Sequence, residues 1–192
     1  MKVIGLAGRA GSGKSAVAKS LAQNPAVEWI DLDVVAWTTY VKGTSVYERL
    51  LGAFGKNILG KSGQIDRIRL ATAAFASPED QITLNAIVHP AVSDAADAII
   101  REHRKKGTEI LLIEGALLAS SPYVDRSAYD LVLWLDAPDE LRTQRLRAIG
   151  RGDHGKRSDE VFPLGNFISI PATGTIEEIA TRVLQTIHNK LG

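Results

Sequence analysis

The stretch that most constrains this chain runs from Gly8 to Ser15 and has the sequence Gly-Arg-Ala-Gly-Ser-Gly-Lys-Ser. It directly follows the apolar run Val3–Ala7 and opens a helical pattern over Lys14–Leu21. Glycines at this spacing between a strand and a helix are typical of a phosphate-binding loop, or P-loop, whose backbone N–H groups bind phosphate oxygens. The positive end of the following helix strengthens the attraction. We therefore expect the loop to bind the triphosphate of ATP or GTP; the alternative is a glycine-rich turn that binds nothing.

The residues of the P-loop have different expected tasks. Lys14 is expected to reach the β- and γ-phosphates, and the Ser15 hydroxyl is expected to ligate Mg²⁺. The motif alone does not indicate which molecule receives the phosphate. The predicted nucleotide-binding residues of this stretch are Gly8, Ala10, Gly11, Ser12, Gly13, Lys14, Ser15 and Ala16.

Short apolar segments predict a parallel sheet, because near-continuous apolar character over four or five residues is typical of strands buried on both faces. The predicted strands are Val3–Ala7, Val27–Ile30, Glu109–Ile113, Leu131–Leu135 and Phe167–Ile170. The predicted helices are Lys14–Leu21, about Ser45–Phe54, Pro78–Ile87, Pro90–Lys106, Pro138–Arg147 and Thr175–Leu191. This alternation predicts an α/β fold, with a five-stranded parallel sheet flanked by helices. Together with the P-loop motif it predicts a fold of the P-loop NTPase type.

The domain organisation follows from the length and from one long interval between strands. A chain of 192 residues suits a single domain, residues 1–192, with a small insertion. The interval between the second and third predicted strands contains helical patterns and no convincing strand. We therefore expect a helical insertion at about residues 34–90, folded over one edge of the sheet.

The composition excludes several classes of protein. The net charge is only +1, so the chain has no overall attraction for polyanions, and we expect no nucleic-acid partner. No apolar run approaches the roughly 20 residues that span a membrane, so we expect no membrane segment. The absence of cysteine fits a reducing cytoplasm. The oligomeric state is not predicted beyond a monomer or a small homo-oligomer.

Acidic residues follow two of the predicted strands, at the edge where open α/β sheets bind their ligands. Of Asp31 and Asp33, one could take a proton from an acceptor hydroxyl while the other holds Mg²⁺ or its waters. The alternative is that Asp33 merely caps the next helix. Glu114 follows the third strand and could hold Mg²⁺ through water, or cap a turn. The predicted metal-binding residues are Ser15, Asp31 and Glu114.

Several motifs in this order resemble those of the dephospho-CoA kinase family, and the resemblance covers nearly the whole chain. The matching pieces are Gly-Ser-Gly-Lys-Ser at 11–15, Ile-Asp-x-Asp at 30–33, Phe54-Gly55 with Ile58, Gly63-x-Ile65-Asp66-Arg67 with Leu70, Phe75, His89-Pro90, Glu114-Gly-Ala-Leu-Leu118 and the basic helix at 142–151. The resemblance implies transfer of the γ-phosphate of ATP, with Mg²⁺, to the ribose 3′-hydroxyl of dephospho-CoA. It implies that Asp33 deprotonates that hydroxyl.

The resemblance also assigns residues to the small-molecule acceptor. The insertion at about 34–90 would hold dephospho-CoA. The implied acceptor-binding residues are Asp33, Arg67, Phe75, His89, Gly115 and Leu117. Alternatives remain for some of them: His89-Pro90 begins a predicted helix, with proline at its favoured first position, and Phe75 could be a core residue. Gly115 is small enough to let a ligand approach the backbone.

Arginines and glycines gather between residues 142 and 157, where the resemblance implies a lid, at about 145–160, that closes on ATP. Arginine suits this role because its fork can hold two phosphate oxygens. We expect Arg145 and Arg151 to be catalytic, together with Lys14 and Asp33; for the arginines the alternative is a solvated basic surface. The loop Pro171–Gly174 would pass the adenine of ATP, which adds Ala172, Gly174 and Arg145 to the predicted nucleotide-binding residues. Thr175 and Glu178 form a predicted capping box there.

Some positions depart from the usual pattern of the family, namely Ala7, Trp37, Ser120 and Ala172. Two alternatives to dephospho-CoA kinase activity therefore stay open. One is a kinase of another small molecule, such as a nucleoside monophosphate or a sugar, on the same fold. The other is an ATP-binding paralogue without activity.

Overall fold

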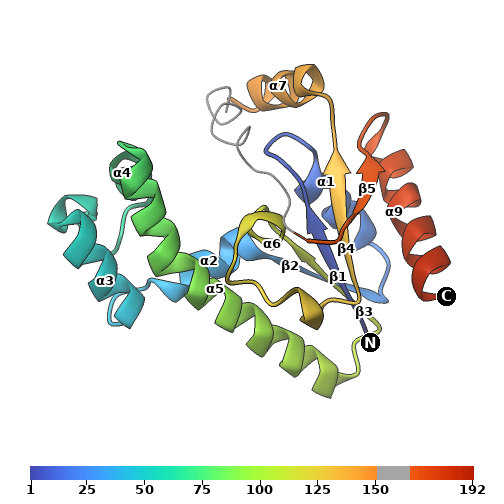
Figure 1. The fold of residues 1–192 in the computed structure, drawn as a ribbon, viewed down its shortest axis with the longest axis horizontal. Coiled ribbons are helices and arrows are strands. Elements are labelled where there is room, and N and C mark those ends of the chain that lie inside the picture. Colours follow the sequence, from blue (N-terminus) through green and yellow to red (C-terminus); the bar gives the residue numbers. More distant parts are fainter. Residues whose placement is uncertain (151–164) are drawn as a thin grey trace. The chain divides into compact units, whose positions relative to one another are not determined.

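The computed structural model describes residues 1–150 and 165–192. Its sheet consists of parallel strands in the order β2-β3-β1-β4-β5 (Figure 1). The strands are β1 (Lys2–Ala7), β2 (Val27–Asp31), β3 (Ile110–Glu114), β4 (Leu131–Asp136) and β5 (Ile168–Pro171). The predicted fold class, an α/β fold with a five-stranded parallel sheet, is confirmed, and each predicted strand end lies within one residue of the observed one.

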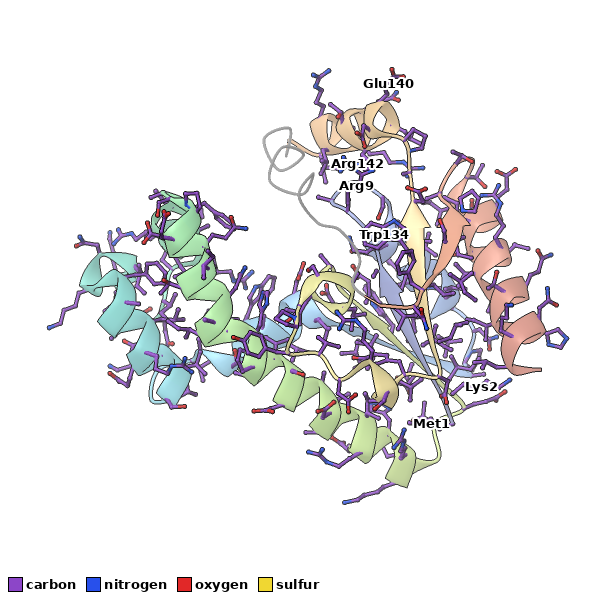
Figure 2. All side chains as sticks on the ribbon, viewed as in Figure 1. Met1, Lys2, Arg9, Trp134, Glu140 and Arg142 are labelled. Carbon is purple, nitrogen blue, oxygen red and sulfur yellow. The ribbon has the colours of Figure 1, made fainter. Side chains whose placement is uncertain are left out.

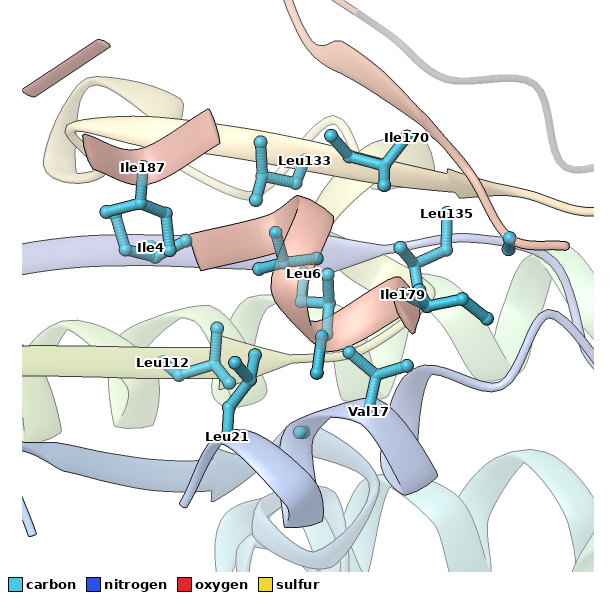
Figure 3. Close-up of a cluster of buried hydrophobic side chains, with 14 of the residues drawn as sticks. Ile4, Leu6, Val17, Leu21, Leu112, Leu133, Leu135, Ile170, Ile179 and Ile187 are labelled. Atoms are coloured by element: carbon cyan, nitrogen blue, oxygen red, sulfur yellow. The ribbon is translucent and has the colours of Figure 1, made fainter. Parts of the chain in front are cut away.

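Two helices cover one face of this sheet, α1 (Lys14–Leu21) and α9 (Ile176–Leu191). Figure 3 shows their apolar side chains interlocking with those of the strands. The buried side chains of this cluster include Ile4, Leu6, Leu112, Leu133 and Leu135 from the strands, and Val17, Leu21, Ile179, Val183 and Ile187 from the helices. Burying this apolar surface is the main source of stability here, and it fixes the start of α1 at the end of β1.

The chain divides into two compact units. Unit 1 comprises Met1–Leu32 and Ile99–Gly192 and contains the sheet. Unit 2, Asp33–Ala98, is helical. The remaining helices are α2 (Leu32–Thr39), α3 (Ser45–Phe54), α4 (Arg67–Ala74), α5 (Pro78–Lys106), α6 (Leu117–Ser120) and α7 (Asp139–Ala148), with short 3-10 helices at Lys56–Ile58 and Arg126–Ala128. The role of the insertion at 34–90 as an acceptor subdomain stays a prediction.

The prediction of two helices at Pro78–Ile87 and Pro90–Lys106 is wrong, because α5 continues through Pro90. A proline inside a helix donates no hydrogen bond to the carbonyl four residues earlier, which here is that of Ala86. The Arg49 side chain, from α3, donates to that carbonyl instead, with an Nη2–O distance of 3.3 Å. A tertiary contact thus replaces the missing helical bond, and His89 and Pro90 lie within the helix rather than at its start.

After the second strand the chain enters a helix that was not predicted. β2 stops at Asp31, and Asp33 lies in the first turn of α2 rather than at the end of the strand. A carboxylate in the first turn of a helix is stabilised by the helix dipole. Asp33 therefore has a local structural reason for its position, besides any chemical one. Within the described residues, no helix is long and apolar enough to cross a membrane.

Candidate active site

The P-loop lies between β1 and α1, at the carboxyl end of the central strand. Gly11 and Gly13 have positive φ angles of 79° and 96°, a conformation that glycine adopts without strain. A pocket of about 430 Å³ opens beside the loop. Its lining residues are Gly11, Gly13, Lys14, Ser15, Ala16, Arg145, Ala148, Ile149 and Ile176. Five of the expected nucleotide-binding residues, Gly11 and Gly13–Ala16, thus line this pocket. The other three from this stretch, Gly8, Ala10 and Ser12, are not among its lining residues.

The three predicted metal-binding residues come together at the carboxyl ends of β2 and β3. The Ser15 hydroxyl donates to Oε1 of Glu114 at 3.2 Å. Asp31 is the register partner of Glu114 in the neighbouring strand, and Glu114 is only 3% exposed. In the described parts of the chain, no group of three or more His, Asp or Glu side chains could hold a metal ion. Two carboxylates and a hydroxyl beside a phosphate pocket fit Mg²⁺, which keeps several waters and takes phosphate oxygens as ligands.

Two arginines of α7 are bonded to the carbonyl groups of the P-loop. Arg145 donates from Nη1 to the Ser12 carbonyl at 3.1 Å and from Nη2 to the Ala172 carbonyl at 3.2 Å. Arg142 donates from Nη1 to the Ala10 carbonyl at 2.9 Å. Arg145, a predicted catalytic residue, therefore connects the P-loop with the loop after β5 and lines the pocket beside the P-loop.

The loop after β5 is short and tightly held. Ala172 is buried, and its N–H donates to the Asp136 carbonyl at 2.7 Å. Gly174 follows with a φ of 92°. The predicted capping box is confirmed: the Thr175 hydroxyl accepts from the Glu178 N–H, and the Glu178 carboxylate accepts from the Thr175 N–H. The loop is thus ordered by its own hydrogen bonds.

Unit 2 has its own pocket, of about 240 Å³. Its lining residues are Asp33, Ala36, Trp37, Tyr40, Leu70, Leu84, Asn85, Val88 and His89. Two predicted acceptor-binding residues, Asp33 and His89, therefore share one cavity. Burial lowers the pKa of His89 to about 4, so its imidazole is neutral at physiological pH. A neutral imidazole beside a carboxylate can donate or accept a hydrogen bond to a polar ligand.

Arg67 is held next to this pocket by an aromatic ring. Its guanidinium carbon lies 2.9 Å from the centre of the Trp37 ring, a cation–π contact. Burial raises the pKa of the Tyr40 phenol; the Arg67 charge opposes this shift and the Asp33 charge adds to it. Arg67 and Asp33 therefore both act electrostatically on Tyr40. Phe75 ends α4, is 38% exposed and is not among the residues lining the pocket.

Gly115 and Leu117 lie in unit 1, directly after β3 and at the start of α6. A Cβ atom on Gly115 would come within 3.0 Å of the Leu32 Cβ. The structure thus gives Gly115 a packing reason for being small. Arg151 lies outside the described residues, as does most of the predicted lid at 145–160.

Several residues of the site were not predicted. Ala148, Ile149 and Ile176 form an apolar part of the P-loop pocket, and Ile149 is 64% exposed. In the sequence Ile149 and Ile176 carry no motif that would mark them as pocket residues. In unit 2, Leu70, Leu84 and Val88 form the apolar wall of the smaller pocket. These side chains become neighbours only through the fold, so local patterns do not reveal them.

The chain is similar to known proteins over nearly its whole length. The family model described as dephospho-CoA kinase matches residues 2–156. A dephospho-CoA kinase of Corynebacterium jeikeium is 34% identical over 191 residues, covering 95% of this chain and 96% of that protein. One of Geobacter sulfurreducens is 32% identical over 189 residues, covering 95% of each. A solved structure from Thermus thermophilus has a TM-score of 0.69 and 25% identity, covering 100% of this chain and 98% of that one.

Proposed function

The chain belongs to the dephospho-CoA kinase family, and we propose that it transfers the γ-phosphate of ATP to the ribose 3′-hydroxyl of dephospho-CoA, giving coenzyme A in the last step of its synthesis. The observation that carries this proposal is the P-loop pocket with the Ser15–Glu114 hydrogen bond at its side. Together they offer a phosphate site and a carboxylate site at one edge of one sheet, as a kinase that uses Mg-ATP requires.

We propose that unit 1 binds ATP. The N–H groups of the P-loop and the Lys14 ammonium attract the phosphates, and the apolar side chains of Ile149 and Ile176 suit the flat face of a base. Arg145 lines the same pocket and is the described candidate for a cation that stabilises the transferred phosphoryl group. Arg151 stays a candidate from the sequence.

Ser15, Asp31 and Glu114 are the residues that would hold Mg²⁺, directly or through its waters. A bound Mg²⁺ neutralises part of the charge on the phosphate oxygens. The buried Glu114 supports this assignment, because an acid in that position needs a positive partner or hydrogen-bond donors to stay ionised. The Ser15 hydroxyl already supplies one donor.

We propose that unit 2 binds the acceptor, with Asp33 as the base. The Asp33 carboxylate takes the proton of the 3′-hydroxyl as that oxygen forms its bond to the γ-phosphorus. The bond from this phosphorus to the β–γ bridging oxygen breaks, and ADP leaves. Asp33 lines the pocket of unit 2 together with His89 and Tyr40, which can hydrogen-bond to the acceptor. Arg67 would bind a phosphate of dephospho-CoA.

The test is ADP release from Mg-ATP with dephospho-CoA, compared with AMP, CMP, adenosine and gluconate as acceptors. We expect turnover with dephospho-CoA alone. Asp33→Asn should keep ATP affinity and lose about 10²–10⁴-fold in kcat, the usual contribution of a general base. Asp94→Asn is the matched control, because Asp94 is an exposed acid on α5 within unit 2.

Each outcome has a definite meaning. Turnover with another acceptor would retain the ATP site and replace the acceptor. ATP binding without any turnover would indicate a paralogue that has lost activity. Near-normal turnover by Asp33→Asn would disprove the assignment of the base.

We also propose that the protein works in the cytoplasm, as a monomer or a small homo-oligomer. The lack of cysteine supports a reducing compartment. Sedimentation velocity across a range of concentrations would determine the oligomeric state.

A further inference from the structure

Helix α7 packs directly against the P-loop. A Cβ atom on Gly11 would lie 2.6 Å from the backbone oxygen of Arg142 and 3.0 Å from Cγ of Leu146. A backbone oxygen cannot move aside as a flexible side chain can. The P-loop and α7 therefore form one packed unit, and side chains of α7 can influence the conformation of the loop.

Arg142 lies at this contact and is only 2% exposed. Its Nη1 donates to the Ala10 carbonyl at 2.9 Å, and its Nη2 and Nε donate to Oδ1 of Asp139 at 3.0 and 3.3 Å. The same Asp139 oxygen accepts from Arg9 of the P-loop at 3.0 Å. We call Arg9, Asp139 and Arg142 the brace; Figure 2 shows Arg9 and Arg142 close together between the P-loop and α7.

The two arginines of the brace stabilise the negative charge of Asp139. The hydrogen bond from Arg142, and then the charge of Arg9, lower the pKa of the Asp139 carboxyl, so Asp139 stays ionised at neutral pH. A buried guanidinium is costly, and an apolar side chain of the same length would fill the space at less cost. The position of Arg142 therefore calls for a reason other than packing.

Peptide geometry supplies that reason. In a planar trans peptide, the carbonyl of one residue and the N–H of the next point in opposite directions. A bond that fixes the Ala10 carbonyl therefore fixes the direction of the Gly11 N–H. The bond from Arg145 to the Ser12 carbonyl does the same for the Gly13 N–H. Both glycines line the phosphate pocket.

We propose that Arg142 is a positioning residue for nucleotide phosphates. From behind the P-loop it holds the Ala10–Gly11 peptide so that the Gly11 N–H is directed at a phosphate oxygen before the nucleotide arrives. This inference rests on the proposed function, because it requires that the pocket bind ATP. Because the donor is already oriented, less conformational entropy is lost when the nucleotide binds.

The variant Arg142→Met tests this directly, since methionine can fill the buried space but cannot donate a hydrogen bond. Binding of ATP is measured by calorimetry, and KM values for ATP and dephospho-CoA are measured with kcat. We expect the dissociation constant and KM for ATP to rise about tenfold, as loss of a charge-assisted hydrogen bond implies. The KM for dephospho-CoA should not change. Arg142→Lys keeps the positive charge and a group that donates hydrogen bonds, and should recover part of the affinity.

Two further variants complete the design. Asp139→Asn changes a side chain that is 68% exposed, so it should fold, and it loosens Arg142 by removing its charged partner; we expect a rise of about threefold in KM for ATP. Arg104→Gln removes a positive charge from an exposed position on α5 and is the control. It should leave both KM values unchanged.

The outcomes separate this inference from the proposed function. If the unaltered protein does not bind ATP, the proposed function fails. If it binds ATP and Arg142→Met binds ATP equally well, or loses affinity for both substrates alike, the inference fails. Should Arg142→Met not fold, an unchanged KM for ATP in Asp139→Asn would overturn it.

Discussion

The continuation of α5 through Pro90 leads to a prediction about stability. A proline inside a helix costs about 3 kcal/mol, through the missing N–H and the clash of its ring with the carbonyl four residues earlier. Here Arg49 supplies a donor to that carbonyl, on Ala86. Both Arg49 and Ala86 are exposed, so water can replace this bond in part. We expect the bond to contribute about 0.5–1 kcal/mol.

A double-mutant cycle isolates this contribution. Arg49→Met should lower the free energy of unfolding by about 0.5–1 kcal/mol when Pro90 is present. Pro90→Ala restores the N–H, so the helix itself satisfies the Ala86 carbonyl. In that background Arg49→Met should cost close to nothing, which gives a coupling energy of about 0.5–1 kcal/mol. Pro90→Ala alone should stabilise the protein by about 1–2 kcal/mol, because greater freedom in the unfolded chain offsets part of the gain.

Urea denaturation followed by circular dichroism and by tryptophan fluorescence measures these free energies, and coincidence of the two signals checks that unfolding is two-state. Arg104→Met is the control: it alters an exposed arginine on α5, the helix that contains Pro90, and should change the free energy of unfolding little. An equal cost of Arg49→Met with Pro90 and with alanine at position 90 would refute the idea that Arg49 replaces the missing helical donor.

Three more predictions follow from single sites. Gly11→Ala places a Cβ 2.6 Å from a backbone oxygen of α7, at a φ of 79° that alanine adopts only with strain. The affinity for ATP, measured by calorimetry, should therefore fall at least about tenfold. Gly52→Ala is the control and should leave this affinity unchanged, because a Cβ at that position meets nothing within 4 Å. The pKa of His89 is about 4 in the folded state, against about 6.5 when unfolded, so the unfolded state binds the proton first as pH falls. Stability should therefore decline between pH 6.5 and 4, and His89→Gln should remove about 1–2 kcal/mol of that decline in urea titrations. Thr175→Ala removes the capping box of α9 and should cost about 1 kcal/mol, seen as a fall of about 2–4 °C in Tm.

The fold was largely predictable because its signals are local. Apolar runs locate the strands, and α1 and α3 have the predicted bounds. The errors occur where a distant part of the chain decides the outcome. Pro90 would end a helix in isolation, but Arg49, forty-one residues earlier, compensates for the missing donor. For a different, local reason α2 is missing from the predicted helices: Asp31 and Asp33 were interpreted chiefly as chemical groups that follow a strand.

The residues of the candidate site were also predictable where their signal is local, and less so where distant parts of the chain meet. The P-loop is contiguous, so its spacing alone indicates its chemistry. Ser15 and Glu114 are ninety-nine residues apart. Glu114 ends β3, and Ser15 lies in the helix that follows β1 and the P-loop, so the rule for parallel sheets brings them to the same end of the sheet. The role of Arg142 could not be predicted from the sequence. In the sequence it is one of several arginines, and only the packing of α7 against Gly11 shows that it is buried.

The order of the strands explains why acids and arginines lie on different sides of the P-loop. β1, which leads into the P-loop, is the central strand. On one side of it, β3 and β2 end in Glu114 and Asp31; on the other, β4 leads into α7 and β5 leads into Ala172. Carboxylates therefore lie on one side of the P-loop, and guanidinium groups hold the loop from the other.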